Sequence, residues 1–251
     1  MIAIRTEDDL TLIRSACHLA AQAMEIAKNE IQPGVTTLRI SEKVREFIEQ
    51  NGATAAFLGY NGYPGAICVS INEEVVHGIP GDRVLVEGDL VKIDIGTFKD
   101  GFYGDMARSY PVGEISPETE ALAESAKKAF YEGINNASAG KCVGDIGYAI
   151  QSFVEKLDYG VVRALVGHGI GRNLHEDPQV PNYGRRGTGP KLRSGMVLAI
   201  EPMITMKRWE VNILDDDWTV VTVDGELSAH YENTCIIRDE TPEILTLMDG
   251  E

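Results

Sequence analysis

The sequence predicts an α+β fold in which two similar halves surround a central antiparallel sheet, with helices on the outside. A Lys99-Asp100-Gly101 turn between two β-rich runs predicts a β-hairpin over residues 88–105. Helical patterns precede the hairpin, and an ordered set of residues recurs 106 positions later. The set is Gly34, Ile40, Val44, Phe47, Ile48 and Glu49, matched by Gly140, Ile146, Ile150, Phe153, Val154 and Glu155.

Helix boundaries are marked by capping residues. A sequence resembling a capping box, Thr6-Glu7-Asp8-Asp9, begins a helix whose apolar stripe continues until Pro33-Gly34. A second helix begins near Thr37 and ends at Asn51-Gly52. Ser116-Pro117-Glu118 opens a third helix with a cap, a first-turn proline and an early acid. We therefore expect two helices before each half of the sheet.

The repeat extends into the strands. Gly88 and Asp94 recur 107 positions later as Gly195 and Glu201, each acid ending an apolar strand. His77-Gly78-Ile79 has an echo in His168-Gly169-Ile170. The second partner strand follows an insertion over residues 207–227 and is expected over residues 228–237. Because the chain has no linker or compositional break, we expect one domain over 1–251, with half-repeats of approximately 1–115 and 116–251.

Composition narrows the function classes. The chain has 251 residues, 43% hydrophobic and 25% charged, which is typical of a globular protein. A net charge of −16 argues against general affinity for nucleic acid or anionic membranes. No run approaches the roughly 18 apolar residues of a membrane span, and the four cysteines form no paired zinc pattern. We expect a cytoplasmic monomer.

Four carboxylates are predicted to meet at the centre of the sheet. A two-residue hairpin loop puts Asp94 and Asp105 on one face, directly opposed or one diagonal apart. Glu201 and Glu232 have the same relation in the second half. Like charges so placed are destabilising unless a cation offsets them. With His168 as a neutral ligand, this hard, oxygen-rich set suits two divalent ions.

Simpler explanations exist for each residue taken alone. A single strand acid is more often an exposed ion-pair partner, and a single histidine such as His168 is more often a core residue. Four acids within apolar strands, placed by a repeat, favour a metal site instead. His77 and His175 lie in Gly- or Pro-flanked turns typical of functional loops. His230 faces the same side as Glu232, and its involvement stays open.

Several motifs together resemble type I methionine aminopeptidase, the metal-dependent family that removes initiator methionine. The resemblance covers nearly the whole chain. Its motifs are Tyr60-Asn61-Gly62-Tyr63-Pro64, Cys68-Val69-Ser70-Ile71-Asn72-Glu73, Val76-His77-Gly78-Ile79-Pro80, Gly167-His168-Gly169-Ile170-Gly171, His175-Glu176-Asp177-Pro178, Ile200-Glu201-Pro202-Met203 and Tyr231-Glu232-Asn233-Thr234.

The resemblance implies the pita-bread fold, a single catalytic domain and a site in which each residue has a role. The implied metal ligands are Asp94, Asp105, His168, Glu201 and Glu232, with Asp105 and Glu232 bridging two ions. The implied catalytic residues are His77, His175 and Glu201. The same two histidines would contact substrate, in a methionine pocket lined by Tyr60, Tyr63, Cys68 and Trp218. Cobalt, manganese, iron and zinc all suit these ligands.

Two positions depart from the better-known bacterial members of the family. Leu174 stands where a phenylalanine is expected, and His230 replaces a polar amide. We expect no N-terminal zinc-binding extension, and the 33 residues from His168 to Glu201 leave no room for the type II insertion. Type I is therefore favoured.

The ligand set predicts a mechanism but leaves alternative functions open. A hydroxide bridging the two ions would attack the first peptide bond of a chain whose free amine ligates one metal. An X-Pro aminopeptidase or dipeptidase of the same fold would use similar ligands, and a non-catalytic binding protein would lose them. The family's substrate, nascent chains, suggests a ribosome contact near the tunnel exit through Arg185, Arg186, Lys191, Arg193, Lys207 and Arg208, although simple solvation of these charges is favoured.

Overall fold

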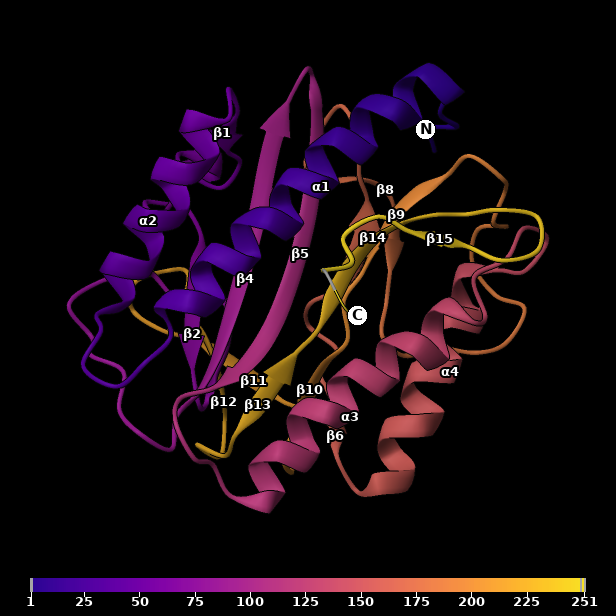
Figure 1. Cartoon of the computed structure of the whole chain (residues 1–251). Coiled ribbons are helices and arrows are strands. Elements are labelled where there is room, and N and C mark those ends of the chain that lie inside the picture. The colour runs from indigo at the N-terminus through magenta and orange to yellow at the C-terminus, as the bar shows by residue number, and fades with distance from the viewer. Residues whose placement is uncertain (1, 249, 251) are drawn as a thin grey trace.

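A large antiparallel sheet, covered on one face by helices, forms the centre of the molecule (Figure 1). The structure is a computed structural model that describes residues 2–248 and 250. Within them, the nine-stranded sheet has the order β1-β4-β5-β14-β9-β7-β8, with β2 on β4 and β15 on β14. The helices are α1 (Glu7–Glu30), α2 (Thr37–Gln50), α3 (Pro117–Ile134) and α4 (Val143–Val154), with short 3-10 turns at Tyr60–Gly62 and Glu155–Leu157.

Two three-stranded sheets complete the described part of the chain, in the orders β13-β10-β6 and β11-β12-β3. The strands are β1 (Thr54–Ala55), β2 (Cys68–Ile71), β3 (Glu74–Val76), β4 (Leu90–Lys99), β5 (Phe102–Pro111), β6 (Gly160–Val161), β7 (Gly167–Gly169), β8 (Glu176–Val180), β9 (Val197–Ile200), β10 (Met203–Thr205), β11 (Val211–Ile213), β12 (Val220–Thr222), β13 (Ser228–His230), β14 (Glu232–Ile236) and β15 (Glu243–Ile244).

The predicted hairpin is confirmed as β4 and β5. Asp100 and Gly101 form its loop with φ angles of 51° and 83°, the left-handed values that a two-residue loop requires. The register pairs Asp94 with Ala107 and Asp105 with Gly96. Asp94 and Asp105 therefore face the same side one diagonal apart, which is one of the two predicted arrangements.

Capping explains where the helices begin. The Thr6 side chain accepts a hydrogen bond from the Asp9 amide, and Asp9 reciprocates, so the predicted capping box is confirmed. Ser116 caps α3 through the Thr119 amide, with Pro117 in the first turn. α1 crosses β4 and β5, whereas α3 and α4 pack together over the second half (Figure 1).

Matched backbone geometry confirms the two halves. Gly34 and Gly140, which precede α2 and α4, both have φ of 92°. In each half the residue after that glycine accepts a hydrogen bond of 2.8 Å from a leucine amide, Leu85 in the first and Leu192 in the second. β5 and β14 pair at the centre, with Glu232 opposite Ala107. The equivalent strands of the two halves therefore meet, as predicted.

Two details of the expected repeat are wrong. Residues 168–170 are not the structural equivalent of His77-Gly78-Ile79. His168 lies in β7, which pairs with β9, and in the first half the strand that pairs in the same way with β4, the counterpart of β9, is β2. His77 instead follows β3 in a separate sheet. The expected strand over residues 228–237 is divided at Tyr231, whose amide donates a hydrogen bond to the Pro202 carbonyl. The part before Tyr231, β13, pairs with β10, and the part after it, β14, pairs with β9.

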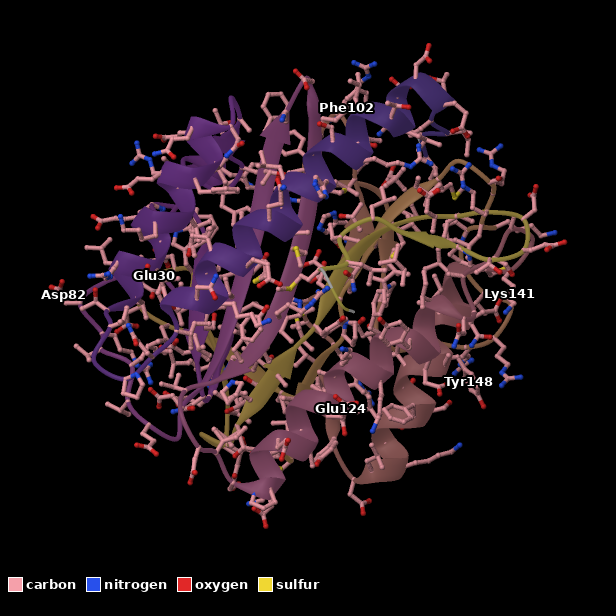
Figure 2. The ribbon with its side chains drawn as sticks, in the orientation of Figure 1. Glu30, Asp82, Phe102, Glu124, Lys141 and Tyr148 are labelled. Carbon is pink, nitrogen blue, oxygen red and sulfur yellow. The ribbon has the colours of Figure 1, made fainter. Side chains whose placement is uncertain are left out.

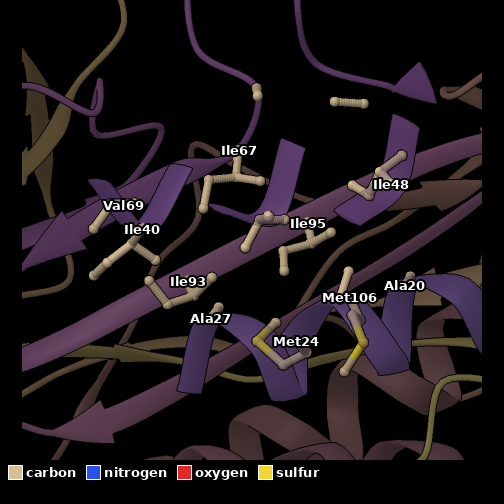
Figure 3. Close-up of a cluster of buried hydrophobic side chains, with 14 of the residues drawn as sticks. Ala20, Met24, Ala27, Ile40, Ile48, Ile67, Val69, Ile93, Ile95 and Met106 are labelled. Carbon is tan, nitrogen blue, oxygen red and sulfur yellow. The ribbon is translucent and has the colours of Figure 1, made fainter. Parts of the chain in front are cut away.

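The main apolar core lies between α1, α2 and the sheet. Figure 3 shows Met24 and Ala27 of α1 facing Ile93, Ile95 and Met106 of the hairpin. Charged residues such as Asp82 and Lys141 lie at the periphery (Figure 2). Among the described residues, none of the helices combines the length and apolarity needed to cross a membrane.

Replacing Met24 with alanine should lower the free energy of unfolding by about 2–5 kcal/mol, because Met24 is fully buried and the substitution leaves a cavity. Urea unfolding followed by circular dichroism measures this loss. Leu12→Ala on the same helix is the control, since Leu12 is 37% exposed and should change stability by no more than about 0.5 kcal/mol. Equal effects of the two substitutions would contradict the assigned core.

Candidate metal centre and substrate pocket

One pocket of about 250 Å³ gathers every site residue predicted from the sequence. It opens on the sheet where the two halves meet. Its predicted members are Tyr60, Tyr63, Cys68, His77, Asp94, Asp105, His168, His175, Glu201, Trp218 and Glu232, and it is also lined by Phe57, Asn61 and Leu174.

The acidic end of the pocket is built on adjacent strands. Asp94 and Asp105 project from β4 and β5, and Glu232 from the start of β14. Glu201 directly follows β9, and His168 lies in β7 opposite Ala199. Because these strands are neighbours in one sheet, hydrogen-bonded ladders fix where each side chain begins. The five predicted metal ligands therefore converge without help from a mobile loop.

Short distances link His168 to the acids. Its Nε2 lies 3.6 Å from Glu201 Oε1 and 3.8 Å from Asp105 Oδ2. Ligand atoms of Asp105, His168 and Glu232 lie within 4.8 Å of one another. His168 Nδ1 is 3.0 Å from the Gly169 carbonyl oxygen, which can only accept. The proton therefore sits on Nδ1, and the Nε2 lone pair faces the acids, as in metal-ligating histidines.

Burial disfavours charge on every carboxyl group of this cluster. It raises the pKa of Asp94 to about 7. The pKa values of Asp105, Glu201 and Glu232 are also raised, by burial first and then by the neighbouring carboxylates. Burial lowers the pKa of His168 to about 3, so this imidazole is neutral and offers no positive charge. The cluster needs a cation from outside.

Unsatisfied oxygen atoms point to the same need. Asp94 Oδ1, Asp105 Oδ1 and Glu232 Oε1 are buried and have no hydrogen-bond partner within the described residues. Buried polar atoms normally have a partner, and leaving one unpaired costs about 1–3 kcal/mol. Carboxylate oxygens with one neutral imidazole are ligands that suit first-row divalent ions. The residues present therefore fit a divalent metal.

One buried arginine supports the acidic cluster from behind. Arg108 donates to the Glu232 carbonyl oxygen at 2.6 Å and to Asn233 Oδ1 at 2.9 Å. Its positive charge acts to lower the pKa of Glu232, opposing the effect of burial. Its guanidinium also lies 4.1 Å from the centre of the Tyr231 ring. Arg108 thus fixes the backbone of Glu232 rather than its carboxylate.

Two histidines flank the cluster. His77 has a φ of 61° after β3, and burial lowers its pKa to about 4. His175 packs edge-on against His168, with 4.2 Å between ring centroids. Its Nδ1 lies 2.7 Å from the hydroxyl oxygen of Tyr60, and partial burial lowers its pKa. Both predicted histidines therefore border the acids without belonging to their innermost group.

The other end of the pocket is lined by aromatic and sulfur-containing side chains. Tyr63 meets Trp218 edge-to-face with 5.0 Å between ring centroids, and its hydroxyl donates to the Gly78 carbonyl at 2.9 Å. Cys68 pairs with Asp94 across β2 and β4, so its thiol stands beside the acids. Burial raises the pKa of that thiol, which is therefore neutral. Leu174 is 1% exposed and closes the wall.

His230, whose involvement the sequence left open, lies close to Glu201. Its Nε2 is 3.8 Å from Glu201 Oε2, and the side chain is buried. Neither ring nitrogen has a hydrogen-bond partner within the described residues. Burial lowers its pKa to about 3, so the ring is neutral. It stands behind Glu201 and is not among the residues that line the pocket.

Two residues that line the pocket were not among the predicted site residues, Phe57 and Asn61. Both belong to the segment between β1 and β2, which has little regular structure, so no periodicity identifies them. Asn61 lies within the Tyr60–Pro64 motif, which is a signal for it, whereas the only signal for Phe57 is its proximity in sequence to that motif.

Without metal, the stability contributed by Asp94 should fall as pH rises from about 4 to about 7. Asp94 has an ordinary pKa of 3.8 when unfolded and about 7 when folded, so within this window the folded state holds a proton that the unfolded chain releases. Burial lowers the pKa of His77 to about 4 and the pKa values of His168 and His230 to about 3, so these histidines add stability as pH rises through the same window, as does Glu243 in its lower part, where Arg14 lowers the pKa to about 2. Melting temperatures of the unmodified protein and of Asp94→Asn, measured in EDTA across pH 4.5–7.5, isolate the contribution of Asp94.

In EDTA, the melting temperature of Asp94→Asn minus that of the unmodified protein should rise with pH, since the substitution removes a group whose stabilising effect is lost over this window. Manganese should stabilise the unmodified protein more as pH rises, because metal ions compete with protons for the same oxygens. A difference that stays constant or falls with pH in EDTA would contradict the assignment.

Comparison with known proteins identifies relatives of the chain. Residues 11–239 match the model of metallopeptidase family M24. The chain is 48% identical over 248 residues to a methionine aminopeptidase from Clostridium perfringens, covering 99% of this chain and 100% of the relative. The crystal structure of methionine aminopeptidase from Rickettsia prowazekii superposes with a TM-score of 0.97 at 43% identity, covering 98% and 100% of the two chains.

A prolidase from Pyrococcus furiosus is more distant. It has a TM-score of 0.80 at 22% identity, and the match covers 98% of this chain but only 66% of the prolidase, so the likeness concerns the fold. The pita-bread architecture is thus common to both kinds of peptidase. High identity along the full length distinguishes them, and the chain belongs to the methionine aminopeptidases of metallopeptidase family M24.

Proposed function

We propose that the protein is a metal-dependent aminopeptidase that removes the N-terminal initiator methionine from nascent polypeptides. The observation that carries this proposal is one pocket with two unlike ends. A buried cluster of acids with one histidine lies directly beside a soft wall of Tyr63, Cys68 and Trp218. The first end suits peptide hydrolysis, and the second suits a thioether side chain.

Two divalent ions are proposed, and Asp94, Asp105, His168, Glu201 and Glu232 would hold them. Cobalt, manganese, iron and zinc all accept these donors. When bound, the ions supply a water of lowered pKa and polarise the scissile carbonyl. Support for this set comes from the unpaired oxygens of Asp94, Asp105 and Glu232.

The remaining polar residues have complementary proposed roles. With the Tyr60 hydroxyl donating to Nδ1 of His175, the proton lies on Nε2, which donates to the oxygen of the scissile carbonyl as negative charge develops there. Glu201, whose pKa is raised, accepts a proton and transfers it to the leaving amine. His77 steadies the peptide nitrogen.

Selection for methionine is proposed to come from the fit of the apolar end. Aromatic edges and the neutral Cys68 thiol offer favourable contacts to a thioether. Tyr63 is held by its bond to Gly78 and by Trp218, so the wall is preformed. A preformed wall favours a side chain of one length and penalises shorter ones.

Other attributes remain proposals. We propose a single catalytic domain with halves of approximately 1–115 and 116–251, of which residues 1 and 251 lie outside the described residues. A monomeric state and a cytoplasmic location are proposed from composition. The proposed ribosome contact through the basic residues has weak support, because Lys207 pairs with Glu226 and Arg208 with Glu210.

Substrate choice tests the proposed function. Metal-depleted protein reconstituted with manganese, iron, cobalt or zinc should release methionine from Met-Ala-Ser and leave Leu-Ala-Ser and Ala-Pro-Ser intact. Of these N-terminal residues, only methionine fits the apolar end of the pocket at Tyr63, Cys68 and Trp218. Glu201→Ala should abolish release. Chromatography of the products measures each reaction. Cleavage before proline would favour an X-Pro peptidase, and no turnover with any metal would favour a binding protein.

Substitution of His175 tests its proposed role. His175→Ala should lower kcat by about 100- to 1000-fold, because it removes a donor to the developing oxyanion. Calorimetric titration with manganese should give unchanged metal affinity, which separates this effect from loss of the metal. Unchanged turnover with metal bound would remove His175 from the mechanism.

A further inference from the structure

The segment before α1 contacts the loop that carries His175. We call residues 2–5 the strap and residues 170–175 the His175 loop. Ile2 packs against the apolar core of the second half, and the Arg5 amide donates to the Gly195 carbonyl at 2.9 Å. The Arg5 side chain, only 8% exposed, extends from this anchored backbone and forms an ion pair with Glu176.

Glu176 joins the strap to the loop. One oxygen of its carboxylate, Oε2, accepts from the Arg5 guanidinium. The other, Oε1, accepts from the backbone amides of Arg172 at 2.9 Å and Asn173 at 3.0 Å. A carboxylate held by an arginine and two amides in this way is fixed in orientation. Its position therefore determines the path of the loop between residues 172 and 176.

The guanidinium of Arg5 also packs directly on the loop backbone. A side chain at Gly171 would overlap the guanidinium, so the glycine permits this close approach. The Gly171 carbonyl accepts from the Tyr103 amide at 2.8 Å, which ties the same point to β5. Arg172 reaches back to Asp9 at 2.9 Å. Both ends of the loop are thus held by the N-terminal part of the chain.

The loop so held presents two side chains to the pocket. Leu174 forms part of the apolar wall, and His175 stands between Tyr60 and His168. We propose that Arg5 is a positioning residue for the aminopeptidase reaction, acting through Glu176 to hold His175 at its catalytic place. The expected effect on catalysis rests on the proposed function, whereas the structural coupling between Arg5 and the His175 loop does not.

Geometry favours this role over simple stabilisation. A displacement of about 1 Å in a reacting group costs on the order of 100-fold in rate. Arg5 touches neither the pocket nor the acids that would bind metal. Its removal should therefore reduce turnover while metal affinity stays unchanged, which a general loss of folding would not do.

The test compares Arg5→Met with Arg14→Met, a matched control. Arg14 makes a bidentate pair with Glu243 and does not line the pocket. We expect Arg5→Met to lower kcat for Met-Ala-Ser by about 10- to 100-fold with manganese affinity unchanged. Arg5→Lys should restore part of the loss, and Arg14→Met should leave kcat unchanged. Equal kcat values for Arg5→Met and Arg14→Met would overturn the proposal.

A double-mutant cycle tests the route. If Arg5 acts through His175, adding Arg5→Met to His175→Ala should lower kcat no further than His175→Ala alone. Losses that multiply would overturn the proposal, because Arg5 would then act elsewhere.

Hydrogen exchange gives a readout independent of activity. In Arg5→Met the amides of residues 171–176 should exchange faster than in the unmodified protein, whereas those of β4, and those of β5 after Tyr103, should not change. Unchanged exchange in the loop would overturn the coupling, whatever the activity. Failure of the unmodified protein to release methionine would instead refute the proposed function, so the two outcomes are distinguishable.

Discussion

Repulsion among four buried carboxylates is the constraint on which the rest of the structure depends. Asp94, Asp105, Glu201 and Glu232 are removed from water and aimed at one another, and burial raises the pKa of each. The neutral His168 cannot balance them. Burying four carboxylates together lowers the stability of the folded state unless a multiply charged cation binds. The centre of the fold is therefore suited to binding a cation rather than to stabilising the protein by itself.

The architecture holds these acids in place against their repulsion. β5 and β14 pair where the halves meet, and ladders on either side extend to β4 and β9. Arg108 fixes the Glu232 backbone from the helical side of the sheet, and the strap holds the loop on the other edge of the pocket. Rigid strands thus carry the acids, whereas most of the side chains proposed to contact substrate lie on loops.

Sequence alone predicts the parts of this site that follow a regular period. Asp100 and Gly101 fix the hairpin, and strand alternation then places Asp94 and Asp105 on one face. Prediction from sequence fails where contacts depend on irregular backbone, as at Phe57. The false echo at His77 arose because three matching residues carry no information about register. The contact from Arg5 to Glu176 spans 171 positions and has no local signal.

The central proposal is that the carboxylate cluster is a site for two ions. Anomalous diffraction from crystals grown with manganese, recorded at the manganese absorption edge, tests it most directly. The account predicts two peaks in this pocket, both within coordination distance of Asp105 and Glu232, with Asp94 beside one and His168 beside the other. Absence of both peaks from the pocket at saturating manganese, or ions bound only at surface acids, would contradict it.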